Sequence, residues 1–159
     1  MEHLLECKNV KLVTAPVDLN TAAVTGDRVD LKGNKKVAFV ISMGTSTGAT
    51  VQFDLKQHNA ASSGTSKALS IANVYYKKAG AATSFTKVEP TVEASSYDLS
   101  TDFAANGGVV IFEVNEDQLD TNNGFGWVSV DIADSGAAKL GSVIAITDSD
   151  LEPAYGLAI

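Results

Sequence analysis

The chain has 159 residues, of which 45% are hydrophobic and 19% are charged. This length suits one domain with a substantial core and is too short for two, and the ordinary apolar content argues against a disordered chain. Its single cysteine, Cys7, cannot form an internal disulfide, so the fold has to rest on packing, which fits assembly in a reducing cytoplasm. No apolar run approaches the roughly 18 residues of a membrane span, so we expect no membrane partner.

The charges are divided unevenly along the chain. Residues 1–87 hold 11 Lys and Arg against 6 Asp and Glu, whereas residues 88–159 hold only Lys139 against 13 Asp and Glu. Either the two halves interleave within one domain and neutralise each other, or basic and acidic patches of separate copies meet. Lysines cluster only at 35–36 and 77–78, so we expect no nucleic-acid partner.

Residues 1–24 are interpreted as an N-terminal arm or edge segment, and residues 25–159 as a single β-sandwich domain. Pro16 interrupts any regular element that passes through the first segment. The segment either reaches a neighbouring subunit or forms an edge strand of its own domain. In the first case its apolar side chains are candidate interface residues, namely Leu4, Leu5, Val10 and Leu12.

After the first segment, short β-like runs alternate with Gly, Ser, Asn and Asp. This pattern predicts an all-β fold, an antiparallel β-sandwich or jelly roll of about eight strands with little helix. The runs at 37–42 and 108–114 are apolar on both faces, which predicts central strands covered by loops, by the second sheet or by another subunit. The candidate strands are 28–31, 36–43, 50–58, 68–77, 84–88, 108–115, 125–133 and 142–148.

Two short segments are candidate helices. One is a stretch at 19–24, and the other is a single turn at 116–119 that Asn115 would cap.

The stretch MGTSTGA at 43–49 matches the G-x-S-x-G spacing that presents a nucleophilic serine in hydrolases. That motif needs a strand before the serine and a helix after it. Here the period-two sequence TVQFDLKQ follows, which predicts a second strand, and Gly44 and Gly48 suit a hairpin loop. We therefore predict that Ser46 is a turn residue and that the chain is not an enzyme.

Asp54, His58 and the nearby serines Ser62 and Ser63 invite comparison with a catalytic triad. Asp54 and His58 share a face of their strand, but their Cα atoms would lie about 13 Å apart, too far for the carboxylate to orient the imidazole. We expect His58 to be an exposed strand end. His3, His58 and Cys7 show no metal-binding spacing, so we predict no transition metal and no cofactor.

Residues 116–123 supply carboxylate and amide oxygens ahead of Gly124, but they miss the register of a calcium-binding loop. The sequence favours a solvated acidic turn there and leaves cation binding open.

The strand at 125–133 alternates clearly, so its faces can be assigned. Val128, Val130 and Ile132 are predicted to face the core, which leaves Trp127, Ser129 and Asp131 on the outward face. An outward Trp127 is either covered by a loop, for instance 79–97, or is an interface residue.

Three segments, in order between residues 10 and 146, carry a resemblance to known proteins. They are TAAVTGDRVDLKGNKKVAFVISMGTSTGATVQFDLKQHNAASSGTSKAL, FTKVEPTVEASSYDLS and VVIFEVNEDQLDTNNGFGWVSVDIADSGAAKLGSVIAI. In these segments the chain resembles small proteins encoded beside the capsid genes of tailed bacteriophages and prophages. Some of those are head decoration, or cement, proteins. The resemblance rests on the order of the segments and on no catalytic motif.

The resemblance implies a non-enzymatic virion protein, assembled in the host cytoplasm, that binds the outer surface of the capsid. Its partners would be the major capsid protein and further copies of itself, in dimers or trimers, and it would stabilise contacts between capsomers. One alternative is a structural protein of the head–tail junction or tail. A second is a carbohydrate-binding β-sandwich that stacks sugars on Trp127, Tyr75, Tyr76 and Tyr97. Because Tyr75 and Tyr76 are consecutive, at most one can join such a platform.

Overall fold

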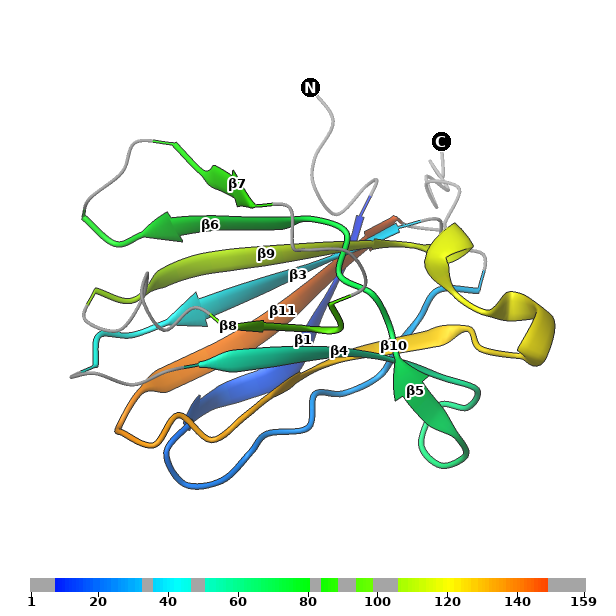
Figure 1. Ribbon diagram of the computed structural model, residues 1–159, viewed down its shortest axis with the longest axis horizontal. Helices are drawn as coiled ribbons and strands as arrows, with labels where there is room; N and C mark the ends of the chain where they lie inside the picture. Colours follow the sequence, from blue (N-terminus) through cyan, green and yellow to red (C-terminus); the bar gives the residue numbers. More distant parts are fainter. Residues whose placement is uncertain are drawn as a thin grey trace, which may run out of the picture.

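The computed structural model describes residues 8–32, 36–46, 51–80, 84–88, 94–98 and 106–148. In these ranges two antiparallel β-sheets pack face to face as a β-sandwich, which confirms the predicted all-β class (Figure 1). The described ranges contain eleven strands rather than about eight, because several are only two or three residues long.

The first sheet has six strands in the order β1-β11-β3-β9-β6-β7. Part of the segment interpreted as an arm or edge segment, residues 8–18, forms the edge strand β1, which pairs with β11. Two register shifts around Thr14 make this edge irregular, and Pro16 cannot donate a ladder hydrogen bond. The six strands are β1 (Lys8–Asp18), β3 (Lys36–Met43), β6 (Val74–Lys78), β7 (Thr86–Val88), β9 (Gly108–Asn115) and β11 (Leu140–Asp148).

The second sheet has the order β2-β10-β4-β5, and β8 also pairs with β4. The predicted single strand at 68–77 is wrong: the chain leaves this sheet after β5 and enters the other sheet at β6. Leu69 and Ile71, on the crossing, are buried in the core. The strands are β2 (Val29–Asp30), β4 (Gln52–His58), β5 (Ser66–Ala68), β8 (Ser96–Asp98) and β10 (Trp127–Ile132).

Helical structure in the described ranges is limited to two short 3₁₀ turns, η1 (Glu116–Gln118) and η2 (Thr121–Asn123). The predicted turn after Asn115 is confirmed, and Gln118 Oε1 accepts a hydrogen bond from the Asn115 backbone N–H at 2.8 Å. The helix expected at 19–24 is wrong, because Val24 forms a β-bridge with Ile132 instead. None of the described helices has the length and apolar character needed to cross a membrane.

The core lies between the sheets and is built from the inward side chains of alternating positions. Phe53 of β4 and Phe112 of β9 join the sheets with ring centroids 5.5 Å apart, and Tyr97 of β8 meets Phe112 edge-on at 6.3 Å. As predicted, the inward residues of β10 are buried, namely Val128, Val130 and Ile132.

The basic and acidic halves of the sequence interleave in this fold. In the six-stranded sheet, β11 lies between β1 and β3, and β9 lies between β3 and β6, so strands of the two halves alternate. Ion pairs connect the halves at Lys8–Asp148, Lys36–Glu113, Lys56–Asp131 and Lys67–Asp120. The two halves of the sequence therefore pair part of their opposite charges within this fold.

Candidate interaction surface

The outward side of the six-stranded sheet is apolar over most of its width. Because directly paired residues of adjacent strands point to the same side, the register places one side chain from each of five strands in a single row. That row is Leu12, Ile144, Val40, Ile111 and Tyr75. We define the apolar face as the outward residues Val10, Leu12, Ala38, Val40, Val109, Ile111, Leu140, Ile144 and Ile146.

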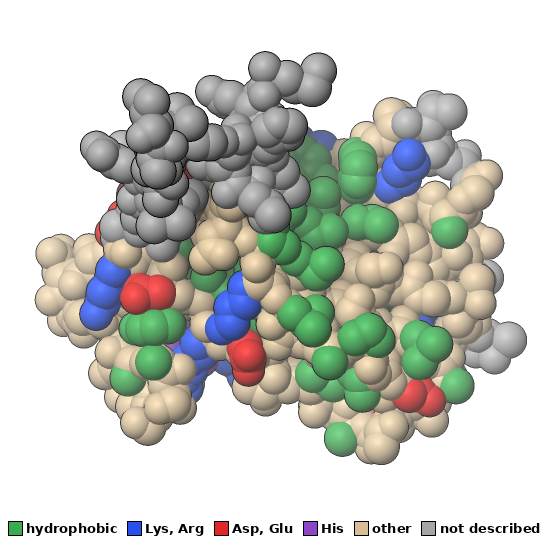
Figure 2. Space-filling view, turned by 180° about the vertical axis from the view of Figure 1, so that it is seen from behind, with side chains coloured by type: hydrophobic (Ala, Val, Ile, Leu, Met, Phe, Trp, Pro, Cys, Tyr) green, Lys and Arg blue, Asp and Glu red, His purple; other side chains and the backbone are tan. Residues whose placement is uncertain are grey.

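Several side chains of the apolar face are well exposed, although they are aliphatic. The exposed fractions are 54% for Leu12, 64% for Leu140 and 38% for Ile144. In Figure 1 the strands β11 and β1 lie behind β4, and in the view from behind in Figure 2 hydrophobic side chains gather across the middle of the molecule. Ser42 and Ser142, which are paired in the ladder, lie among these side chains on the same side of the sheet. An exposed apolar surface of this kind marks a site of contact with another macromolecule.

Charged groups lie around the apolar face rather than within it. At one end, Lys36 pairs with Glu113 at 3.0 Å, and Lys8 pairs with Asp148. On the β6 and β7 side, the ladder places Lys77 opposite Val109 and Lys87 opposite Tyr75. An apolar centre with a charged rim is the usual composition of a protein–protein interface.

The structure brings two of the predicted interface residues into this surface. Val10 and Leu12 are outward on β1, while Leu4 and Leu5 lie outside the described residues. Sequence reasoning missed the other members of the face. The signal that could have found Val40 and Ile111 is the pair of runs that are apolar on both sides.

Trp127 lies on the other side of the molecule, on the outward face of the five-stranded sheet. It is half-buried and pairs in the ladder with His58 on one side and Asp30 on the other. It therefore shares no surface with Val10 and Leu12.

The polar residues beside Trp127 correct one expectation and refine another. His58 is 4% exposed, so the prediction of an exposed His58 is wrong. Ser129 lies on the outward side of β10, as predicted, but it is 0% exposed. Alternation within one strand cannot reveal contacts with distant parts of the chain. The Arg28 guanidinium donates hydrogen bonds of 2.7 Å to the carbonyl oxygens of Ala60 and Ser63, which ties down the loop after β4.

His58, Ser129 and Asp131 form a hydrogen-bonded cluster on the outward side of β4 and β10. His58 Nε2 lies 2.9 Å from Ser129 Oγ, which donates to Asp131 Oδ1 at 3.3 Å. Lys56 Nζ donates to the other carboxylate oxygen of Asp131 at 2.7 Å. Burial, and then the positive charge of Arg28, lower the pKa of His58 below its ordinary value, so the imidazole is neutral at pH 7.

This cluster does not have the arrangement of a catalytic triad. In a triad the carboxylate binds the imidazole nitrogen that faces away from the serine. Here Asp131 binds Ser129, and His58 Nδ1 has no hydrogen-bond partner. Ser129 is also fully buried, so a substrate cannot reach its hydroxyl. The cluster therefore serves to hold the outer face of β4 and β10.

Ser46 follows β3, and the next element along the chain is the strand β4, as predicted from the pattern. Among the residues that the structure describes, its Oγ has no hydrogen-bond partner.

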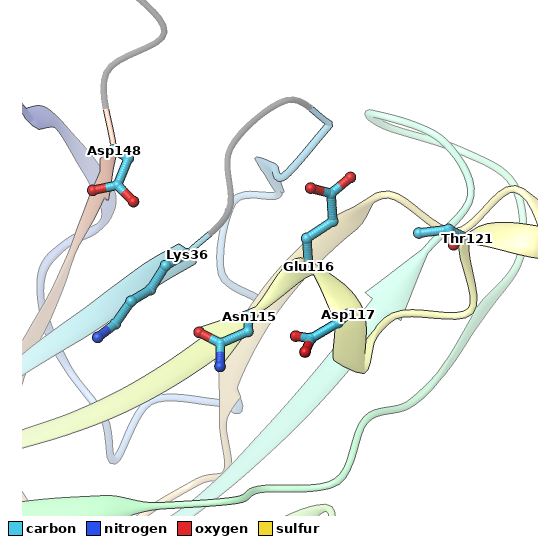
Figure 3. A pocket seen from close by; sticks show the side chains of 6 residues that line it. All are labelled: Lys36, Asn115, Glu116, Asp117, Thr121 and Asp148. Carbon is cyan, nitrogen blue, oxygen red and sulfur yellow. The ribbon is translucent and has the colours of Figure 1, made fainter.

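The acidic turns η1 and η2 border an open pocket of about 660 Å³. Figure 3 shows the side chains of Glu116 and Asp117 pointing in different directions from their turn. Asp120 is engaged by Lys67 and by the Asn123 amide, and these contacts lower the pKa of its carboxyl. Across the described ranges, no group of three or more His, Cys, Asp or Glu residues could hold a metal ion.

The aromatic residues proposed for sugar stacking are dispersed. Tyr75 is outward on the six-stranded sheet, whereas Tyr76 and Tyr97 pack against the core, so the predicted opposition of Tyr75 and Tyr76 is confirmed. Trp127 is on the other sheet. These four side chains do not form one platform.

Comparison with known proteins adds little. No protein-family model matches the chain, and a search of curated proteins finds no match. Among solved structures, the chain is similar to the SPBc2 prophage-derived protein YomS, with 13% identity and a TM-score of 0.49. That match covers 89% of this chain and 93% of the other. A likeness at this level carries no argument about function.

Proposed function

We propose that the chain is a structural virion protein that binds the outer surface of a tailed-phage capsid and stabilises contacts between capsomers. The observation that carries this proposal is the apolar face: its exposed aliphatic side chains favour association with another protein surface, which suits a chain that works within an assembly of many copies. The resemblance of three sequence segments to proteins encoded beside phage capsid genes indicates the kind of assembly.

In this proposal the protein acts through binding, without catalysis. A ligand that binds an assembled shell better than its separate subunits stabilises the shell by mass action. Many identical contacts on one lattice strengthen each other through multivalency, so each contact can be weak. The partners are the major capsid protein and further copies of the chain, and the location is the capsid surface, reached after assembly in the host cytoplasm.

The proposal is tested with phage heads prepared without the protein. Purified protein is mixed with these heads, the heads are sedimented, and the bound protein is counted per particle. We expect saturable binding at hundreds of copies per head and a higher unfolding temperature of the shell. Bovine serum albumin at the same concentration controls for trapping in the pellet.

Failure to bind, together with heads that are equally stable without the protein, would refute the proposal. A saturation at six or twelve copies would instead indicate a ring at the head–tail junction.

A further inference from the structure

We propose that the apolar face is the contact between two copies of this chain, packed sheet against sheet about a twofold axis. The inference deepens the proposed function by naming the partner that binds the apolar face. It rests on that function only where it assigns the dimer to a virion. The capsid would then be contacted by other surfaces of the dimer.

The size of the apolar face matches a dimer contact. The four strands that carry the apolar face, about 4.8 Å apart and with roughly seven residues each at about 3.3 Å, give a footprint of roughly 19 by 23 Å, about 440 Å² in projection. Side chains roughen this area, and the charged rim enlarges it. A stable interface buries about 800 Å² of accessible surface on each partner. The apolar face together with its charged rim is therefore of the order of the area that each partner of a dimer buries.

The charges around the apolar face allow a second copy of the same chain to approach it. With a net charge of −7, two copies repel each other through most of their surfaces. At the apolar face the carboxylates of Glu113 and Asp148 are already neutralised by Lys36 and Lys8 of the same chain. Two such faces can approach without like charges meeting at the centre. A strongly charged partner would find no complementary charge there.

The side chains of the face suit a contact between two pleated surfaces. Val10, Val40, Ile111, Ile144 and Ile146 are β-branched, so they lose little rotamer freedom when they are covered. Twisted sheets pack about 10 Å apart with their side chains interdigitated, as the two sheets of this sandwich already do. The same packing between outward faces would make a four-layered dimer. In a twofold contact each residue of the face is used twice.

The test measures the mass of the protein in solution and its response to one added charge. Sedimentation equilibrium from about 1 to about 100 μM is expected to give twice the monomer mass of 16.5 kDa. Ile144→Lys places a charge near the middle of the face in both copies and should weaken dimerisation at least about 100-fold. Gln52→Lys, at an exposed strand position of the other sheet, is the matched control and should dimerise normally.

A second variant protects the test against loss of folding. Leu12→Lys lies on the edge strand β1, where the side chain is 54% exposed, so the monomer tolerates it. Circular dichroism and thermal unfolding of each variant establish that the fold is intact. If Ile144→Lys does not fold, Leu12→Lys decides, with an expected weakening of at least about 10-fold.

Three results would overturn the inference. They are a monomeric wild-type protein over the whole concentration range, a trimer, or a dimer that Gln52→Lys weakens as much as the face variants do. The proposed function is judged separately. A dimer that does not bind heads supports the inference and refutes the decoration role. A monomer that binds heads, and that Ile144→Lys releases from them, refutes the inference and supports that role.

Discussion

Ile111 and Phe112 are neighbours in β9, and substituting each by alanine should affect different properties. Phe112→Ala should mainly lower the stability of the monomer, and Ile111→Ala should mainly weaken dimerisation. Phe112 is 1% exposed, and its ring lies between Phe53 and Tyr97, with centroid distances of 5.5 Å and 6.3 Å. Ile111 points to the other side of the sheet, opposite Val40 and Tyr75, where it belongs to the apolar face.

The magnitudes follow from these surroundings. Truncating a buried phenylalanine to alanine costs about 3–5 kcal/mol, which includes the lost contacts between the rings. For a chain of this length that corresponds to an unfolding temperature lower by roughly 6–20 °C. Ile111 is half-buried in the monomer, so Ile111→Ala should cost only about 1–2 kcal/mol of monomer stability. It should, however, weaken dimerisation about 10-fold or more.

Urea unfolding at low protein concentration measures monomer stability, and sedimentation equilibrium measures dimerisation. We expect Phe112→Ala to lower the free energy of unfolding by at least about 1 kcal/mol more than Ile111→Ala, while its folded fraction still dimerises. Equal losses of stability, or a larger loss for Ile111→Ala, would refute the assignment of these two residues to opposite sides of the sheet.

Three further predictions follow from local geometry. Since the pKa of folded His58 is below its ordinary 6.5, the unfolded chain binds the proton first. The contribution of His58 to the free energy of unfolding should therefore be complete above pH 6.5 and should fall as the pH drops from 6.5 through the folded pKa. Urea unfolding between about pH 4 and 8 should show this slope, and His58→Gln should flatten it. Gly107 has φ 60° and an added Cβ would lie 2.5 Å from the Met43 carbonyl oxygen, whereas Gly124 has φ 81° and open space. Gly107→Ala should thus cost at least about 3 kcal/mol and Gly124→Ala only about 1 kcal/mol in thermal unfolding, and equal costs would contradict the close contact. Finally, millimolar Ca²⁺ should shift the unfolding temperature by less than about 1 °C, and a saturable rise would reveal a cation site at the acidic turns.

The parts of the fold that the sequence could predict are those in which alternation is regular. The bounds of β3 and β9 were predicted to the residue, and the inward side of β10 was assigned correctly through Val128, Val130 and Ile132. Period-two patterning reports which side chains share a face, and it needs no knowledge of distant partners. The two runs that are apolar on both faces, 37–42 and 108–114, also indicated correctly that β3 and β9 lie in the interior of a sheet.

The rest depends on contacts that are remote in the sequence. His58 was predicted to be exposed, and the burial of the outward Ser129 was not foreseen, because alternation cannot show that Arg28 ties a loop down beside them. The register shifts around Thr14 obscured β1, and β8 is too short to give a pattern. The apolar face itself appears only when the register places Leu12 beside Ile144 and Val40.

Cysteine labelling gives the most direct test that the apolar face is covered in the native protein. Ile144→Cys in a Cys7→Ser background places one thiol on the face, and Gln52→Cys in the same background places one on the other sheet. At high protein concentration a maleimide should modify the first thiol at least about 10-fold more slowly than after dilution to the monomer, with no change for the second. Equal and concentration-independent rates at both positions would contradict the account.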